Sequence, residues 1–184
     1  MNTHETKRNL GKMLSQIFKA KETPQPIYAI SASLPQRTME VLEGYQYEEL
    51  IQQDILHALQ VLKEHNIPQP LYVILLGPAV REELRTTQED PTDPSDIDIV
   101  VILGDEDMRQ LDEQQRVNKT LSWSQPSSGI KHFILKPQSV TDVLAPTEAT
   151  IYSKTGIEQQ LNSGMSDLPT VFLQSAMREG IVYQ

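Results

Sequence analysis

Residues 71–103 read LYVILLGPAVREELRTTQEDPTDPSDIDIVVIL, and this stretch decides how the chain folds. Two apolar runs of strand length, 71–76 and 97–103, enclose a polar segment that is broken by prolines. Continuous apolar runs of this length are typical of strands that are buried on both faces of a sheet. The pattern therefore places two carboxylates, Asp96 and Asp98, at the beginning of a buried strand.

Further elements are predicted on either side of this stretch. Apolar spacing and flanking stop signals predict helices over 47–65, 104–121 and 137–144. A third apolar run predicts a strand over 130–135. The tail is expected to form a helix that ends at Gly180 and a short last strand over 181–183.

Length and composition limit the classes of protein that the chain fits. Its 184 residues suit one domain with a terminal extension. The chain has no cysteine, so disulfides and thiolate sites are excluded, and a reducing cytoplasm is the expected compartment. A net charge of −9 disfavours a long nucleic-acid partner. No apolar run approaches the roughly 18 residues that span a bilayer, so no membrane partner is expected.

The N-terminal part differs in charge from the rest of the chain. Residues 1–22 carry five basic and two acidic side chains, a net of +3, which leaves −12 for the remainder. Apolar residues recur there at helical spacing, at Leu10, Met13, Leu14, Ile17 and Phe18. This basic amphipathic helix could pack on its own domain or on a second copy, dock on another protein, or touch membrane or nucleic acid. We therefore divide the chain into a helix and irregular arm, 1–44, and a domain, 45–184.

Asp96 and Asp98 stand two residues apart on the predicted strand. Side chains two apart on a strand project from the same face, so the two carboxylates share one space while Ile97 and Ile99 face the core. Two ionised acids so close repel each other, and a hard divalent cation such as Mg²⁺ offsets that repulsion. A solvated strand edge or a turn cap is the alternative explanation of such a pair.

The order of the elements around this pair resembles the DNA polymerase beta-type nucleotidyltransferase superfamily. A strand ending in LG, a loop, PSDIDIVVIL, a helix and a strand followed by KPQSV are similar to its short stand-alone group, the minimal nucleotidyltransferases. The tail MREGIVYQ is similar to the usual ending of that group. The resemblance covers residues 67–184. It implies an α/β (α+β) fold, a small twisted mixed sheet with helices packed mainly on one face.

The resemblance also implies a site. Gly77 matches the glycine of the turn that holds the phosphates of the nucleotide, with Pro78 next to it, and Ser95 matches the serine before the acidic pair. Asp96 and Asp98 match the ligands of two Mg²⁺ ions, for which Mn²⁺ can substitute. The implied substrate is a nucleoside triphosphate.

The chain departs from the family pattern in three places. Pro78 replaces a serine, so a backbone N–H and a hydroxyl that could bind phosphate are missing. Residues 85–94 form an insertion that is expected to be acidic, exposed and poorly ordered. Lys131 stands where a third carboxylate is expected, and we predict that it projects beside Asp96 and Asp98 and pairs with one of them in the absence of metal.

Two functions follow from the resemblance, and a third interpretation sets it aside. The first is a Mg²⁺-dependent enzyme that moves a nucleoside monophosphate from a triphosphate to a hydroxyl of a protein, an RNA or a small molecule. The second is a degenerate nucleotidyltransferase fold that acts as a protein-binding or regulatory module. The third is an unrelated acidic α/β domain. Many minimal nucleotidyltransferases are antitoxins, so a protein partner, or self-association through the N-terminal helix, is expected.

Overall fold

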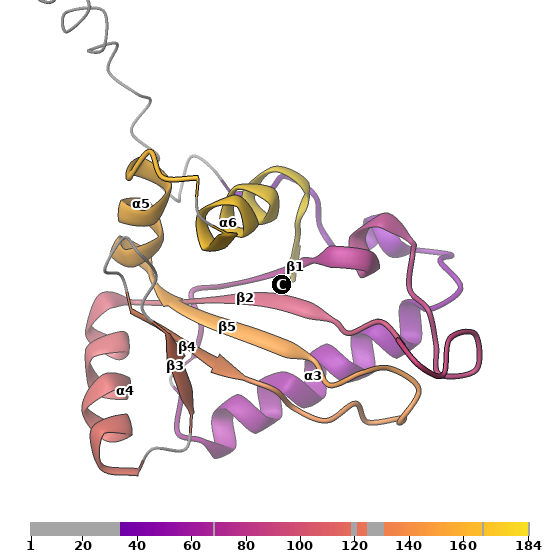
Figure 1. Cartoon of the computed structure of the whole chain (residues 1–184), viewed down its shortest axis with the longest axis horizontal. Coiled ribbons are helices and arrows are strands. Elements are labelled where there is room, and N and C mark those ends of the chain that lie inside the picture. Colours follow the sequence, from indigo (N-terminus) through magenta and orange to yellow (C-terminus); the bar gives the residue numbers. More distant parts are fainter. Residues whose placement is uncertain (1–33, 68, 119–120, 125–130, 167, 184) are drawn as a thin grey trace, which may run out of the picture.

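The computed structural model describes residues 34–67, 69–118, 121–124, 131–166 and 168–183. A six-stranded mixed sheet with the strand order β3-β4-β5-β2-β1-β6 lies at its centre (Figure 1). Strands β2 and β5 run parallel, and the other neighbouring pairs run antiparallel. The predicted α+β class is confirmed. The helix predicted within residues 1–22 lies outside the described residues.

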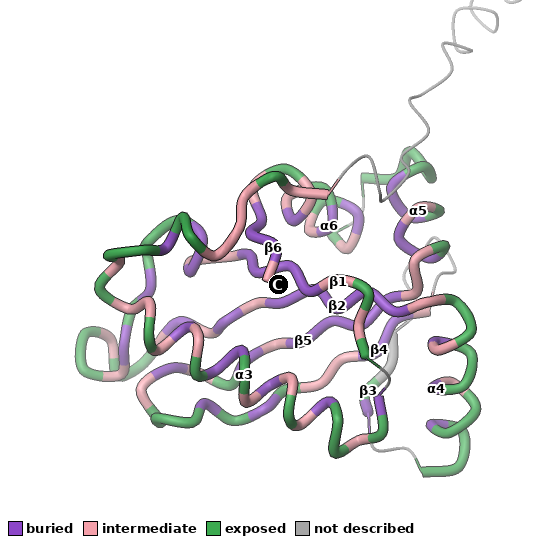
Figure 2. The backbone as a smooth tube through the Cα atoms, turned by 180° about the vertical axis from the view of Figure 1, so that it is seen from behind, coloured by how far each residue is buried: buried purple, intermediate pink, exposed green. Residues whose placement is uncertain are grey.

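The elements agree with most of the ranges expected from the sequence. The strands are β1 (Tyr72–Leu76), β2 (Asp98–Leu103), β3 (Ser122–Ser124), β4 (His132–Leu135), β5 (Glu148–Ser153) and β6 (Ile181–Tyr183). The helices are α3 (Glu48–Glu64), α4 (Asp105–Asn118), α5 (Lys154–Asn162) and α6 (Leu168–Glu179), with 3-10 turns η1 (Met39–Leu42) and η2 (Gly77–Arg81). The residues of β1 and β2 are buried except for Tyr72 and Asp98, which are half-buried, whereas Leu71 before β1 is 49% exposed (Figure 2).

Helices cover both faces of the sheet. The apolar stripes of α3 and α4 pack on the odd-numbered residues of the central strands, such as Ile99 and Val101, and form the larger core. Helices α5 and α6 pack on the even-numbered residues, such as Val100 and Ile102. The sequence analysis expected helices mainly on one face. In the structure helices pack on both faces, and the larger of the two cores lies under α3 and α4. None of the helices in the described ranges combines the length and the apolar composition that crossing a bilayer requires.

The segment before α3 is part of this fold, and Leu34 already packs against the smaller core. The Arg37 guanidinium donates to the carbonyl of Glu179 at the end of α6, at 2.8 Å, and Thr38 bridges to Val182 of β6. Leu42 is 1% exposed and belongs to the larger core. Residues 37–42, which the sequence assigned to an irregular arm, are thus held by the domain because they cover the free edge of β6.

This packing makes a prediction about Leu42. Replacing Leu42 with alanine should lower the free energy of unfolding by about 2–4 kcal/mol, because the change leaves a cavity in the core. Its neighbour Val41 is 44% exposed, so Val41→Ala should change stability by less than about 1 kcal/mol. Urea denaturation of both variants measures the difference. Equal effects would show that η1 does not pack as described.

Several elements differ from the prediction. Residues 137–144 form no helix; instead the N–H of Val140 donates to the buried carboxylate of Asp54 on α3, at 2.8 Å, and holds this segment as a loop. The strand β5 and the helix α5, which follow this loop, were not predicted. Their polar and apolar residues alternate too irregularly to form the continuous apolar runs that identified β1 and β2.

Candidate functional site

A row of polar residues crosses the sheet where β2 and β5 begin. In the β1–β2 pair Leu76 lies opposite Asp98, and in the β2–β5 pair Asp98 lies opposite Glu148. In the β4–β5 pair Leu135 lies opposite Ala149, so Lys136, the next residue, continues the row beside Glu148. Because β2 and β5 are parallel, their first residues lie at the same end of the sheet (Figure 1).

These residues share one face of the sheet. Residues that lie opposite each other across a ladder project to the same side, and Asp98 and Glu148 have the parity of the residues covered by α5 and α6. Asp98 and Asp96 are half-buried, whereas Ile97 and Ile99 are fully buried in the core on the other face. The predicted burial of these two isoleucines is confirmed. Asp96, which was predicted to share the strand with Asp98, lies two residues before the first residue of β2 and outside it.

The surroundings of Asp98 disfavour its ionised form. Burial raises the pKa of the Asp98 carboxyl from 3.8 to about 7, and the negative charges of Asp96 and Glu148 act in the same direction. The positive charges of Lys136 and Arg81 oppose this increase in the pKa. Asp96 and Glu148 are thus close enough to Asp98 to repel its negative charge, and a bound divalent cation relieves such repulsion.

Gly77 forms the turn that faces this carboxylate. Its φ of 75° lies in the left-handed region, which glycine adopts without strain. A Cβ atom at this position would overlap Oδ2 of Asp98, so the missing side chain leaves the space that the carboxylate fills. Pro78 follows as the first residues of η2 turn away from β1. The geometry of the turn thus requires a glycine at position 77.

Gly77→Ala should therefore harm both the fold and the site. The left-handed backbone costs about 1 kcal/mol for alanine, and the clash with Asp98 adds to this. Gly44 is a matched control, since its φ is 81° and a Cβ added there would meet no atom within 4 Å. Gly44→Ala should carry the backbone cost alone. Thermal denaturation of both variants measures the difference, and equal losses would show that Gly77 does not make room for Asp98.

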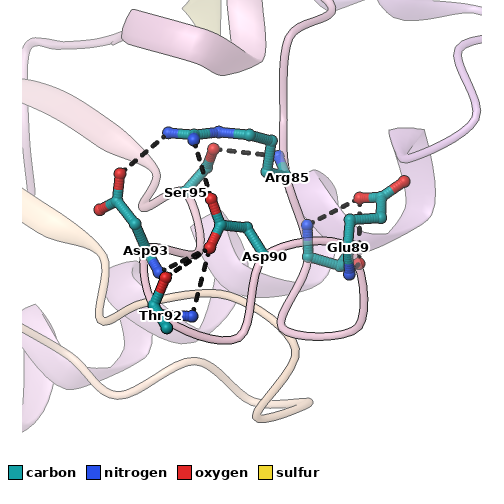
Figure 3. Close-up of polar contacts among 7 residues, drawn as sticks. Arg85, Glu89, Asp90, Thr92, Asp93 and Ser95 are labelled. Atoms are coloured by element: carbon teal, nitrogen blue, oxygen red, sulfur yellow. Dashed lines mark hydrogen bonds and ion pairs between the residues drawn. The ribbon is translucent and has the colours of Figure 1, made fainter.

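Ser95 is held by the inserted loop. It is 5% exposed, and its hydroxyl accepts a hydrogen bond from the N–H of Arg85 at 3.0 Å (Figure 3). The backbone N–H of Ser95 donates to the carbonyl of Arg85, and its carbonyl accepts from the N–H of Ala145. These bonds fix the end of the loop directly before Asp96. The structure therefore supports a positioning role for Ser95, while its contact with nucleotide stays a prediction.

The inserted loop, 85–94, is exposed over most of its length, as predicted, yet it is tied internally. Arg85 forms ion pairs with Asp90 and Asp93 at 3.1 and 3.2 Å, and Asp90 accepts hydrogen bonds from Thr92 (Figure 3). Glu89 accepts from the N–H of Thr86 at 2.8 Å. The expectation of a poorly ordered segment is not supported by this network.

Lys131 does not lie beside the acidic pair. It precedes β4, which is separated from β2 by β5, and the β4–β5 register places it near Ser153 at the far end of β5. Its ammonium forms an ion pair with Asp112 of α4 at 2.5 Å. The prediction that Lys131 pairs with Asp96 or Asp98 is therefore wrong. Lys131 directly precedes β4, and β5 lies between β4 and β2 in the sheet.

Glu148 is the residue that the sequence reasoning missed. It stands in the ladder beside Asp98, and Lys136 pairs with it at 2.6 Å. The signal that could have identified β5 is the β-branched and aromatic segment ATIY, bounded by Pro146 and by the helix cap Ser153.

Carboxylate oxygens are the ligands that Mg²⁺ and Mn²⁺ prefer, so the donor set of Asp96, Asp98 and Glu148 fits such an ion. Within the described residues, however, no three acidic or histidine side chains already converge as ligands. Binding of an ion would require the Glu148 carboxylate to exchange Lys136 for the metal. Pro78, at the turn, offers no N–H to a phosphate.

Comparisons with profiles of known protein families, with characterised proteins and with solved structures find no match for this chain.

Proposed function

We propose that this protein is a nucleotidyltransferase that requires Mg²⁺ or Mn²⁺ and transfers a nucleoside monophosphate from a nucleoside triphosphate to a hydroxyl group. The observation that carries the proposal is the placement of Glu148 opposite Asp98, with Asp96 next to them. Glu148 supplies a third carboxylate. The sequence analysis expected this acid at the position that Lys131 holds in the sequence. The resemblance around PSDIDIVV supports the same interpretation.

The side chains have distinct roles in this proposal. Asp96, Asp98 and Glu148 hold the divalent cation, which when bound neutralises charge on the triphosphate. Glu148, or Asp98, accepts the proton of the attacking hydroxyl. The hydroxyl oxygen forms a bond to the α-phosphorus while the bond from that phosphorus to pyrophosphate breaks. Gly77 leaves the space in which the carboxylate of Asp98 lies beside the reacting groups.

A second candidate is a degenerate fold of the same kind that binds a protein partner without catalysis. Two observations favour it. Pro78 has no backbone N–H that could donate to a phosphate at the turn, and the carboxylate of Glu148 is engaged in an ion pair with Lys136. In this case Asp96, Asp98 and Glu148, here called the acidic row, have lost their catalytic role, and the positive charge of Lys136 stays paired with Glu148. The two candidates differ in whether divalent ions and triphosphates bind.

Thermal denaturation separates them. With Mg²⁺ and each of the four common ribonucleoside triphosphates in turn, the enzyme should show a rise in melting temperature of about 5–10 °C for the preferred nucleotide at a concentration near 100 times its Kd. EDTA should abolish the rise, because triphosphate binding depends on the cation. The degenerate fold should show no rise that depends on metal.

A further inference from the structure

Lys136 stands at the end of the acidic row with its ammonium exposed. Its side chain is 62% exposed and its Nζ atom lies 2.6 Å from a carboxylate oxygen of Glu148. In the ladder Lys136, Glu148 and Asp98 occupy neighbouring positions on three adjacent strands. Neighbouring strands lie about 4.8 Å apart, so Glu148 is one strand spacing and Asp98 two spacings from Lys136. The hydrogen bond to Glu148 and the negative charge of that residue raise the pKa of Lys136, and the negative charges of Asp96 and Asp98 act in the same direction.

The ion pair competes with a divalent cation for the same carboxylate. The Glu148 oxygen that accepts from the Lys136 ammonium at 2.6 Å has little room for a second cation on the same lone pair. The positive charges of the ammonium and of a metal ion also repel each other. An exposed ion pair of this kind stabilises a protein by about 0–1 kcal/mol, so it can break at little cost. Lys136 is therefore a displaceable occupant of the site.

We propose that Lys136 acts as an exchangeable counterion: it holds Glu148 in the metal-free protein, leaves when a divalent cation binds to the acids, and then contacts the phosphates of the nucleoside triphosphate. This inference rests on the proposed function and adds a substrate-binding residue and an order of binding to it. Pro78 cannot donate an N–H to phosphate, and the released ammonium supplies the donor that the turn lacks.

Arg81 is the other cation whose charge acts on Asp98. It lies at the end of η2, and its guanidinium is engaged by Glu83 at 2.8 Å, outside the acidic row. Lys136 is the cation that forms a direct ion pair with an acid of the row. Lysine also suits exchange, because its ammonium is a point charge on a flexible stem, so it can turn from one anion to another.

The test uses Lys136→Met, which keeps the apolar stem and removes the charge. Lys131→Met is the matched control, because Lys131 is also a lysine in an ion pair next to β4 but lies at the other end of the sheet. In calorimetric titrations without nucleotide, the Kd for Mn²⁺ should fall by about threefold or more in Lys136→Met, because a competing cation is removed. At saturating Mn²⁺, the Kd for a non-hydrolysable analogue of the preferred triphosphate should rise by about tenfold.

The two constants are expected to move in opposite directions in Lys136→Met and to stay at the wild-type values in Lys131→Met. If both constants of Lys136→Met equal those of the wild type, the exchange does not occur, although the proposed function stands. If both constants change in the same direction, Lys136 shapes the site without exchanging, and the inference is overturned. If the wild type binds no Mn²⁺, the proposed function and the inference fail together. Melting temperatures of both variants check that the fold is retained.

Discussion

Glu148→Gln is expected to lower the rate of nucleotidyl transfer by about 10²–10⁴-fold, the usual effect of removing a general base. The amide has nearly the same shape as the carboxylate, so the strand β5 should keep its place in the sheet. Because glutamine carries no charge, the Kd for Mn²⁺ should rise in the same variant. Release of pyrophosphate from the preferred triphosphate measures the rate, and calorimetry measures the affinity for the metal.

Lys131→Asp is the informative comparison for Glu148→Gln. If Lys131 stood at the place of the third acid, an aspartate there would strengthen metal binding and raise the rate. The structure places Lys131 beside Asp112, so this variant should change neither quantity and should only add repulsion next to α4. A large gain in Lys131→Asp, together with no loss in Glu148→Gln, would show that the assignment of Glu148 is incorrect.

Asp98→Asn is expected to remove a dependence of stability on pH. In the metal-free folded protein the pKa of Asp98 is raised to about 7, above its value of 3.8 in a solvated chain. Between these values Asp98 binds more protons in the folded state than in the unfolded state, so its contribution to stability is greatest below pH 4 and falls as pH rises to 7. Solvent screening of this half-buried group limits the loss to about 2 kcal/mol.

An asparagine at position 98 cannot titrate, so the free energy of unfolding of Asp98→Asn should lack this decline between pH 4 and 7. Mg²⁺ should reverse the decline in the wild type, because the cation stabilises the ionised carboxylate. Asp142→Asn, which changes an exposed acid outside the site, is the control and should keep the wild-type profile. Urea denaturation at a series of pH values measures the effect. Parallel profiles for Asp98→Asn and the wild type would contradict the burial of this charge.

The parts of the fold that were predicted correctly are those whose signal is local. The runs at 71–76 and 97–103 are almost wholly apolar, so burial on both faces could be read from the sequence, and β1 and β2 follow. The position of Asp98 at the beginning of β2 was predicted for the same reason. Since β2 starts at this residue, the alternation of the strand fixes the face that carries the acid.

The third carboxylate could not be found in this way because its place depends on the pairing of strands far apart in the chain. The resemblance aligned the strand over 130–135 with the third acidic strand of the superfamily, beside β2, and this led to Lys131. In the sheet, β5 enters between β2 and β4, so Glu148 takes that position. Strand order is a tertiary property, and no local pattern at 130–135 indicates it.

The claim that Asp96, Asp98 and Glu148 form a divalent cation site is tested most directly by calorimetric titration of the protein with Mn²⁺. The wild type, prepared free of metal, is compared with Asp98→Asn and with Asp142→Asn. The account predicts saturable binding in the wild type and in Asp142→Asn, and a loss of affinity by about 100-fold or more in Asp98→Asn. Absence of saturable binding in the wild type, or equal affinities in the wild type and Asp98→Asn, would contradict it.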